Sequence, residues 1–269
     1  MLDGRLYVAG GFGLGHRQVA TFEAFDPRAN AWSELAPLPE ARDHAALTAL
    51  GGRLYLSGGN ADALSPRANL WIYDPAADRW SAARLMPGRR SAHAAVAVDG
   101  ALYVLGGVIA DHPLEAPTWR YDPRSGEWQS DLAPPPTYRE HVAAVAMDDG
   151  TIVLIGGRSA GDLAAVERYD PRTDSWSVMP PLPSPRGGLT AAVLDGAIHV
   201  TGGEGIDPVR IVAEHDVFDP VAGSWSLGPP LPSGRHGLAS GVIDGRWYVA
   251  AGGEHPDLAV ADRLTIYSP

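Results

Sequence analysis

The 269-residue chain carries 21 basic residues, all of them arginine, against 32 acidic residues, which gives a formal net charge of −11. An acidic surface disfavours general binding to nucleic acid or to an anionic membrane, and the absence of lysine excludes a Schiff-base lysine and a P-loop lysine. The absence of cysteine excludes disulfides, thiolate metal sites and cysteine nucleophiles. No apolar run reaches the roughly 18–20 residues that a membrane span needs.

One phrase occurs six times along the chain. It is MLDGRLYVAGG at residues 1–11, and it returns as LGGRLYLSGG (50–59), VDGALYVLGG (98–107), DDGTIVLIGG (148–157), LDGAIHVTGG (194–203) and IDGRWYVAAGG (243–253). The Gly-Gly pairs begin at Gly10, Gly58, Gly106, Gly156, Gly202 and Gly252, at intervals of 46 to 50 residues. Self-similarity at such a period indicates a repeat architecture.

Other residues recur at fixed places within each repeat. An aromatic-Asp-Pro sequence begins at Phe25, Tyr73, Tyr121, Tyr169 and Phe218, with a divergent sixth copy, YSP, at Tyr267. Six residues after each of the five aspartates comes a tryptophan, at Trp32, Trp80, Trp128, Trp176 and Trp225. A proline-rich stretch then ends on an arginine, at Arg42, Arg90, Arg139, Arg186 and Arg235.

Each repeat predicts four short strands and no helix. A small apolar first strand, such as HAAVAV at 93–98, is followed by Asp-Gly or Gly-Gly, which supply the positive φ angles of a type I′ hairpin turn. The second strand ends on glycines that permit close backbone approach, the third ends at the Asp-Pro turn, and the fourth carries the tryptophan. One such unit cannot bury both of its faces alone. We therefore expect radial stacking, with the recurring tyrosines and tryptophans packed between neighbours.

The order Gly-Gly, Tyr-Asp-Pro and then Trp, repeated six times over essentially the whole chain, resembles the kelch repeat. This resemblance implies an all-β fold, a single six-bladed β-propeller of four-stranded antiparallel blades. It implies one domain over residues 1–269, with blades at about 1–41, 42–89, 90–138, 139–185, 186–234 and 235–269.

The strand count predicts two incomplete blades. The first blade lacks its inner strand, of which Met1 to Asp3 form a stub, and the sixth ends before an outer strand. An upstream segment of roughly 25–30 residues would supply both strands, close the ring and leave no unpaired edge. On this hypothesis Met1 is an internal or misassigned start. The alternative is an open ring held by side-chain packing alone.

The connections between second and third strands vary in length and composition, and function usually lies on such loops. The five arginines named above open the first strands on the same side, where we expect a ring near the channel mouth. Four carry a histidine within three residues, at His44, His93, His141 and His236. A positive collar predicts binding of an anionic ligand or an acidic peptide. A residue that recurs in every repeat equally fits a structural role in its own blade, and this alternative stays open.

The loop GGEGIDPVR at 202–210 is the most suggestive of these connections. Its Glu204 and Arg210 resemble the Glu…Arg loop of bacterial kelch-type sialic acid mutarotases. That resemblance implies Glu204 as the acid/base and Arg210 as the group that holds the sugar carboxylate. A surface ion pair between the two is the structural alternative. Glu254 also follows a Gly-Gly pair, so the feature is not unique to this repeat.

Two functional classes therefore remain. The first is a non-catalytic binding module whose loop-rich face takes a protein segment or a small anionic or sugar ligand. The second is a sugar-acid mutarotase or a similar propeller enzyme. No cofactor is expected, and no metal either, because the histidines lack close ligand spacing. The compartment, cytoplasmic or secreted, is left open, and the alanine-rich, lysine-free composition is typical of a GC-rich bacterial genome.

Overall fold

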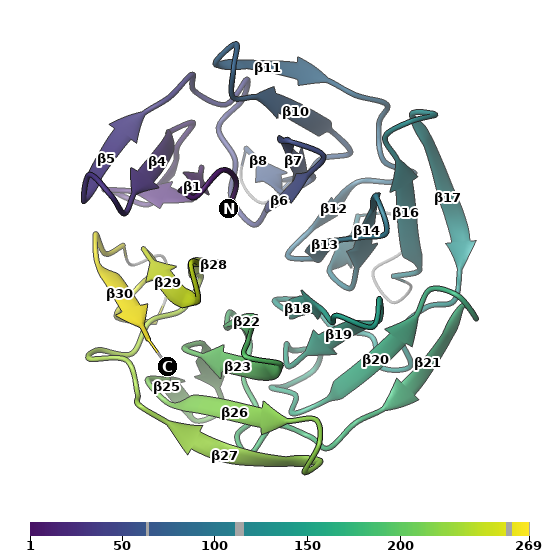
Figure 1. Ribbon diagram of the computed structural model, residues 1–269, viewed down its shortest axis with the longest axis vertical. Helices are drawn as coiled ribbons and strands as arrows, with labels where there is room; N and C mark the ends of the chain where they lie inside the picture. Colours follow the sequence, from purple (N-terminus) through teal and green to yellow (C-terminus); the bar gives the residue numbers. More distant parts are fainter. Residues whose placement is uncertain (63–64, 111–115, 257–259, 269) are drawn as a thin grey trace. The chain divides into compact units, whose positions relative to one another are not determined.

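The computed structural model describes residues 1–62, 65–110, 116–256 and 260–268. The chain forms two compact units, unit 1 at Met1–Leu132 and unit 2 at Ala133–Pro269. Within the described ranges every regular element is a strand. The strands form six antiparallel sheets of three or four strands, three in each unit, and four two-stranded ladders in the loops (Figure 1). The fold class is the predicted one, an all-β, six-bladed β-propeller. The expectation of a single domain stays a prediction.

Unit 1 contains the first three blades. Their strands are β1 (Leu6–Ala9), β4 (Phe22–Asp26) and β5 (Ala31–Glu34); β6 (Ala46–Leu50), β7 (Arg53–Ser57), β10 (Leu70–Asp74) and β11 (Arg79–Ala82); and β13 (Ala94–Val98), β14 (Ala101–Leu105), β16 (Thr118–Asp122) and β17 (Glu127–Leu132). Short ladders in the loops join β2 (Phe12–Gly13) to β3 (Arg17–Gln18), β8 (Asn60–Ala61) to β9 (Ser65–Pro66), and β12 (Arg90–Ser91) to β15 (Val108–Ile109).

Unit 2 contains the other three blades. Their strands are β18 (Ala143–Ala146), β19 (Ile152–Ile155), β20 (Val166–Asp170) and β21 (Ser175–Val178); β22 (Thr190–Leu194), β23 (Ala197–Thr201), β26 (His215–Asp219) and β27 (Ser224–Gly228); and β28 (Ala239–Ile243), β29 (Arg246–Ala250) and β30 (Leu264–Tyr267). A loop hairpin joins β24 (Glu204–Ile206) to β25 (Val209–Ile211). Among the described residues the first and sixth sheets have three strands each, as the repeat pattern predicts.

The turns between first and second strands follow the Asp-Gly pattern with one exception. At Asp195-Gly196, for example, φ is 50° and 77°, which are the two positive angles of a type I′ turn. The fourth repeat differs, because Asp148, Asp149 and Gly150 form a three-residue loop in which only Gly150, at 80°, has positive φ. The prediction of a two-residue turn is therefore wrong for this repeat, where one extra residue is absorbed by a left-handed glycine.

Aromatic side chains fill the seams between neighbouring blades of a unit. Phe22 of the first blade lies 4.7 Å, centroid to centroid, from Tyr73 of the second and 4.9 Å from Trp80. The Trp80 indole also donates a 2.9 Å hydrogen bond to the Ala36 carbonyl, which belongs to the segment that leaves the first blade. The same bond recurs from Trp128 to Arg84, from Trp176 to Ala133 and from Trp225 to Pro180. The recurring aromatic residues therefore join blades.

Four of the Gly-Gly pairs dock their backbone on the arginine that opens the next blade of the same unit. The N–H of Gly203 donates to the Arg235 carbonyl at 2.8 Å, and a Cβ on Gly202 would lie 2.5 Å from the same oxygen. The bond recurs from Gly11 to Arg42, from Gly59 to Arg90 and from Gly157 to Arg186. A side chain at the first glycine would push neighbouring blades apart, so the repeat needs glycine there.

In the sixth repeat the structural pair is displaced by one residue. Ala251 and Gly252 have φ angles of 57° and 89° and correspond to the glycine pairs of the other repeats, whereas Gly253 bridges to His236. The assignment of Gly252 and Gly253 to this pair is therefore wrong. Glu254 consequently corresponds to Gly205, and not to Glu204.

Candidate functional site

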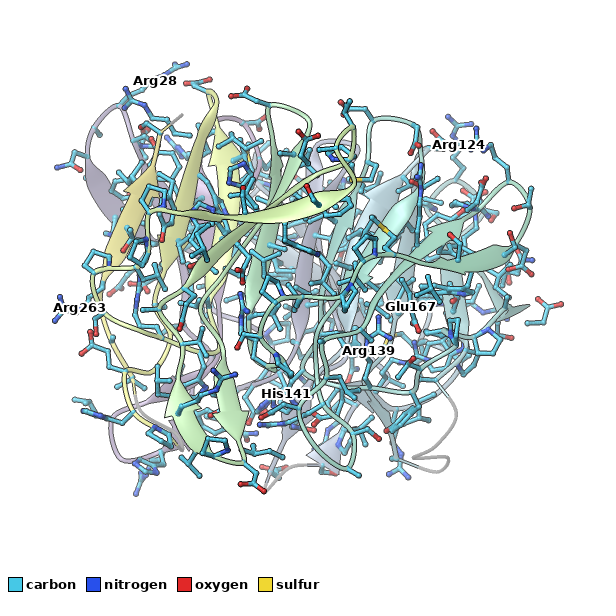
Figure 2. The ribbon with its side chains drawn as sticks, turned by 90° about the horizontal axis from the view of Figure 1, so that it is seen from below. Arg28, Arg124, Arg139, His141, Glu167 and Arg263 are labelled. Atoms are coloured by element: carbon cyan, nitrogen blue, oxygen red, sulfur yellow. The ribbon has the colours of Figure 1, made fainter. Side chains whose placement is uncertain are left out.

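The five repeat arginines are buried within their own blades. Arg42, Arg90, Arg139, Arg186 and Arg235 are each at most 1% exposed. In unit 2, Arg139 bonds to the buried Glu167 and to the Leu154 carbonyl, and Arg235 donates to the Ala251 carbonyl at 2.7 Å. Figure 2 shows Arg139 and Glu167 within the body of this unit. A buried guanidinium cannot contact a ligand that binds from solvent, so this geometry favours the structural alternative. A ligand role for these arginines stays a prediction.

The remaining arginines use comparable partners. Arg186 donates to the Asp216 carboxylate and the Gly202 carbonyl. Arg90 donates to the Val104 carbonyl and lies 3.5 Å over the Trp119 ring. Arg42 is bonded to Glu40 and lies 4.6 Å from the Trp71 ring centroid. In each blade the guanidinium ties the first strand to the middle of its own sheet.

The four histidines near these arginines have different surroundings. His93, three residues after its arginine, is buried and lies 2.8 Å from the Ser57 hydroxyl, and burial together with Arg90 lowers its pKa to about 3. His44 and His141, two residues after, and His236, one residue after, are partly exposed. A small difference in spacing therefore decides which histidine can meet solvent.

A backbone bridge beside each arginine positions the partly exposed side chains. The residue after the arginine pairs with the residue after the Gly-Gly pair of the same blade. In unit 2 these bridges are Glu140 with Arg158, Gly187 with Glu204, and His236 with Gly253. This pairing brings side chains from three blades to the loop side of the unit.

Four side chains form one hydrogen-bonded network and a fifth, His236, lies beside it; we call the five the Arg158 cluster: Glu140, His141, Arg158, Glu204 and His236. Arg158 donates from Nε to Glu140, from Nη1 to Glu204 and from Nη2 to His141 Nε2, each at 2.9 Å. His141 Nδ1 bonds in turn to Glu140. Because the Arg158 guanidinium can only donate, Nε2 of His141 is the acceptor in this contact and Nδ1 is left to donate to Glu140. His236 Nδ1 lies 3.7 Å from Glu204 Oε2.

The Arg158 cluster is accessible although it is partly desolvated. The side chains of its five residues are 13–19% exposed. Figure 2 shows His141 farther than Arg139 and Glu167 toward the loop side of unit 2. Charged groups at this depth interact more strongly than they would at a fully wet surface, and they still reach solvent.

The two residues of the GGEGIDPVR loop lie on opposite faces of its hairpin. Glu204 pairs with Ile211 across β24 and β25, whereas Arg210 pairs with Gly205. Side chains of successive strand residues point to opposite faces, so Glu204 and Arg210 diverge. The Arg210 guanidinium donates to the Ser184 hydroxyl at 2.7 Å and to the Pro185 carbonyl. In the described ranges the ionic partner of Glu204 at hydrogen-bond distance is Arg158, so the expected surface pair with Arg210 is not formed.

A second polar cluster lies in unit 1. The buried Asp43 carboxylate accepts from Asn60 Nδ2 at 3.0 Å, from His44 Nδ1 at 2.5 Å, and from Gln18. Burial acts to raise the pKa of the Asp43 carboxyl, but the hydrogen bonds from His44 and Gln18 together outweigh it and hold the pKa below its ordinary value. The Phe12 ring stands edge-on to His44 at 6.1 Å. This cluster fastens the loops of two blades and places His44 beside them.

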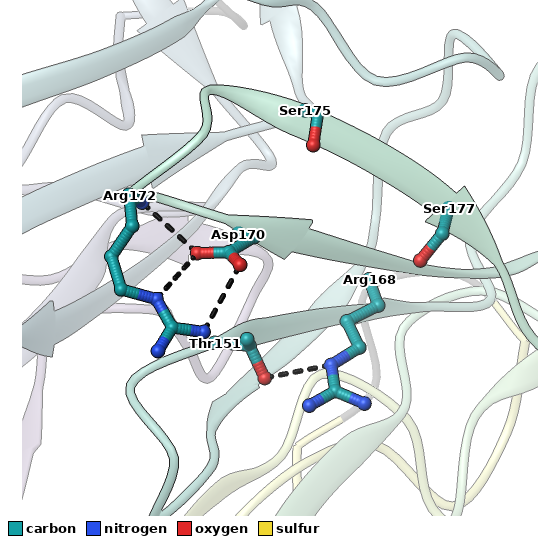
Figure 3. A pocket seen from close by; sticks show the side chains of 6 residues that line it. All are labelled: Thr151, Arg168, Asp170, Arg172, Ser175 and Ser177. Carbon is teal, nitrogen blue, oxygen red and sulfur yellow. Dashed lines mark hydrogen bonds and ion pairs between the residues drawn. The ribbon is translucent and has the colours of Figure 1, made fainter.

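The outer part of the fourth blade has a shallow pocket of about 250 Å³, shown in Figure 3. Its arginines are satisfied within the blade: Arg172 bonds to both Asp170 oxygens at 3.0 Å, and Arg168 donates to the Thr151 hydroxyl at 2.9 Å. Ser175 and Ser177 complete the lining. The pocket is polar and open, and its charges are neutralised locally.

Two residues of the Arg158 cluster were not singled out from sequence. Arg158 and Glu140 occupy the places after a Gly-Gly pair and after a repeat arginine, and their partners lie up to 46 residues away. The usable signal was that Arg158 stands at the same repeat position as Glu204. Among the described residues, no group of three His, Asp or Glu side chains is arranged to hold a metal ion. No helix in the described ranges could span a membrane.

These features define a kelch-type propeller, and comparison with known proteins agrees. The family model of the KLHDC2/KLHL20/DRC7 Kelch-repeats domain matches residues 1–133 and 92–269. The chain belongs to the kelch-repeat β-propeller family, whose fold generally serves as a protein-interaction module. The family recognised from sequence and the six-bladed fold class are thereby confirmed.

Individual relatives show the same repeat. Kelch-like protein 35 of Mus musculus is 30% identical over 75% of this chain and 26% of its own length. Kelch domain-containing protein 7A of Mus musculus is 46% identical over 24% of this chain and 8% of its own length. The chain thus matches about a quarter or less of these relatives. The solved structure of YjhT superimposes with a TM-score of 0.83 at 18% identity, over all of this chain and 95% of that one, which shows a shared fold.

Proposed function

We propose that the chain is a non-catalytic binding module that takes a protein segment on the loop side of unit 2. The observation that carries this proposal is the hairpin β24–β25, whose Ile206 and Val209 are 41% and 66% exposed beside the Arg158 cluster. Exposed apolar side chains next to partly desolvated polar groups are the usual composition of a recognition surface. The buried repeat arginines give less support to a small anionic ligand.

The test is selection of a phage-displayed random dodecapeptide library against the full chain. The selected peptides are then measured by fluorescence polarisation against Val209→Asp and against the control Val221→Asp. Val221 is 97% exposed and lies in the turn between β26 and β27, away from the loop side. We expect Val209→Asp to weaken binding by at least about tenfold, because it buries a charge against an apolar partner, and Val221→Asp to leave it unchanged. Selection of no specific peptide would refute the proposal.

A sugar-acid mutarotase is the second candidate, because Arg158 and His236 converge on the partly buried Glu204 carboxylate. In this alternative Glu204 is the acid/base, and Arg210 must turn away from Ser184 to hold the sugar carboxylate. The measurement is the anomeric exchange of N-acetylneuraminate, followed by NMR with the wild type and with Glu204→Gln. If the wild type accelerates the anomeric exchange and Glu204→Gln does not, the result supports a mutarotase. If the exchange rate with the wild type equals the rate in buffer alone, the mutarotase function is excluded.

A further inference from the structure

We propose that the bound segment presents an arginine or lysine to the Glu204 carboxylate and, two residues away in an extended conformation, an apolar side chain to Ile206 and Val209. This inference rests on the proposed function and names the chemistry of the partner. Three observations carry it: the charge of the loops, the unused capacity of one carboxylate oxygen, and the shared face of the hairpin.

The connections between second and third strands of unit 2 are acidic. The described residues in segments 158–165, 204–214 and 254–263 include three arginines and twice as many carboxylates. The arginines are Arg158, Arg210 and Arg263, and the carboxylates are Asp162, Glu204, Asp207, Glu214, Glu254 and Asp262. An excess of negative charge attracts a cationic partner and repels an acidic one.

Glu204 has an oxygen available for such a partner. Its Oε1 accepts from Arg158 at 2.9 Å, whereas its Oε2 lies 3.7 Å from His236 Nδ1, which is longer than a hydrogen bond. A carboxylate oxygen accepts about two hydrogen bonds, so Oε2 has room for a guanidinium or ammonium donor. Because the Glu204 side chain is only 13% exposed, a charge-assisted bond there is stronger than at a free surface.

The hairpin fixes the spacing between the charge and the apolar contact. Glu204 and Ile206 are two residues apart on β24, and Val209 is the cross-strand partner of Ile206. Alternate strand residues and directly opposite residues share a face, so these three side chains lie on one face of the hairpin. Two residues of strand extend about 6.6 Å, which equals the separation of alternate side chains in an extended partner. The expected motif is a basic residue and an apolar residue separated by one position, in either order.

The experiment selects two phage-displayed libraries of eleven-residue peptides against the full chain. One library has a fixed central arginine, and the other has a fixed central glutamate. We expect specific binders from the arginine library, enriched in Leu, Ile, Val or Phe two positions from the centre. Replacing the central arginine of a selected peptide by neutral citrulline should weaken binding at least about tenfold, since a bond to a charged group is lost. Higher salt should weaken it as well.

Variants of the protein locate the contact. Glu204→Gln keeps the shape of the side chain, removes its charge and should reproduce the loss seen with citrulline. Asp244→Asn, a carboxylate-to-amide change in the exposed turn between β28 and β29, should have no effect. The inference is overturned if binders come equally from the glutamate library or if citrulline binds as tightly as arginine. In that case a peptide-binding function survives, whereas failure of both libraries removes the proposed function too. The citrulline comparison uses wild-type protein and is independent of how Glu204→Gln folds.

Discussion

Arg186 and Asp216 form a fully buried ion pair inside the fifth blade. The Arg186 Nη2 atom lies 2.7 Å from Asp216 Oδ2, and both side chains are at most 2% exposed. The same guanidinium donates to the Gly202 carbonyl at 2.9 Å and to the Ser184 carbonyl at 3.0 Å. One arginine therefore connects the first strand, the second strand and the third strand of its blade.

Removal of this arginine should be strongly destabilising. Arg186→Ala leaves the Asp216 carboxylate buried without its cation, which typically costs about 3–5 kcal/mol of unfolding free energy. The measurement is urea unfolding, with Arg210→Ala as the control because Arg210 is a partly exposed loop arginine. We expect the control to lie within about 1 kcal/mol of the wild type. Equal losses for the two variants would contradict a structural role for the buried pair.

Alanine at the first glycine of a Gly-Gly pair should separate two blades. A Cβ on Gly202 would lie 2.4 Å from Leu238 Cδ1 and 2.5 Å from the Arg235 carbonyl oxygen. Gly196 is the matched control, because it has a similar left-handed φ and nothing within 4 Å of the added Cβ. Gly196→Ala should cost about 1–2 kcal/mol for the backbone conformation alone. Gly202→Ala should cost at least twice as much in thermal or urea unfolding, and a smaller loss would argue against tight docking.

His93 should make stability depend on pH below neutrality. Burial lowers its folded-state pKa to about 3, whereas an unfolded histidine titrates near 6.5. Between these values the unfolded state binds a proton that the folded state does not, so the unfolding free energy falls as pH falls. From pH 7 to pH 5 this histidine alone should remove about 2 kcal/mol. Burial also lowers the pKa of His199 and of His215, which act in the same direction.

The check on this dependence is the slope of unfolding free energy against pH, measured from pH 7 to pH 5. His93→Gln should flatten the slope whatever its absolute stability, and His16→Asn, at an exposed loop position, should not. An unchanged slope in His93→Gln would show that His93 is not kept neutral by burial.

The chain should unfold in one cooperative transition. Its repeats follow one another without a linker from Met1 onward, and this continuity is the basis for the prediction of a single domain. Intrinsic tryptophan fluorescence and far-ultraviolet circular dichroism should therefore give coincident urea midpoints. Two resolved transitions would assign units 1 and 2 to separate folding units.

The fold could be predicted from the repeated residues, because each of them has the same local structural role in every repeat. The Asp195-Gly196 sequence predicts a type I′ turn, and both residues have the positive φ angles that this turn needs. Trp80 marks the outer strand of its blade, and its indole bonds to the segment that leaves the preceding blade. Two local features escaped this reasoning. The extra residue before Gly150 and the displaced pair at Ala251 are single-residue shifts, which a repeat pattern hides and hydrogen-bond register reveals.

The amino-acid sequence by itself determined the number of repeats, the strand order within a blade and the side on which variable loops gather, because turns and strand periodicity depend on near neighbours. Only the tertiary structure decided which polar residues meet. It buried Arg186 and its counterparts, turned Arg210 away from Glu204, and joined Glu204 to Arg158 from the preceding blade. Such contacts depend on the packing of blades and on strand register. A shift of the register by one residue would move every side chain of a strand to the opposite face of the sheet.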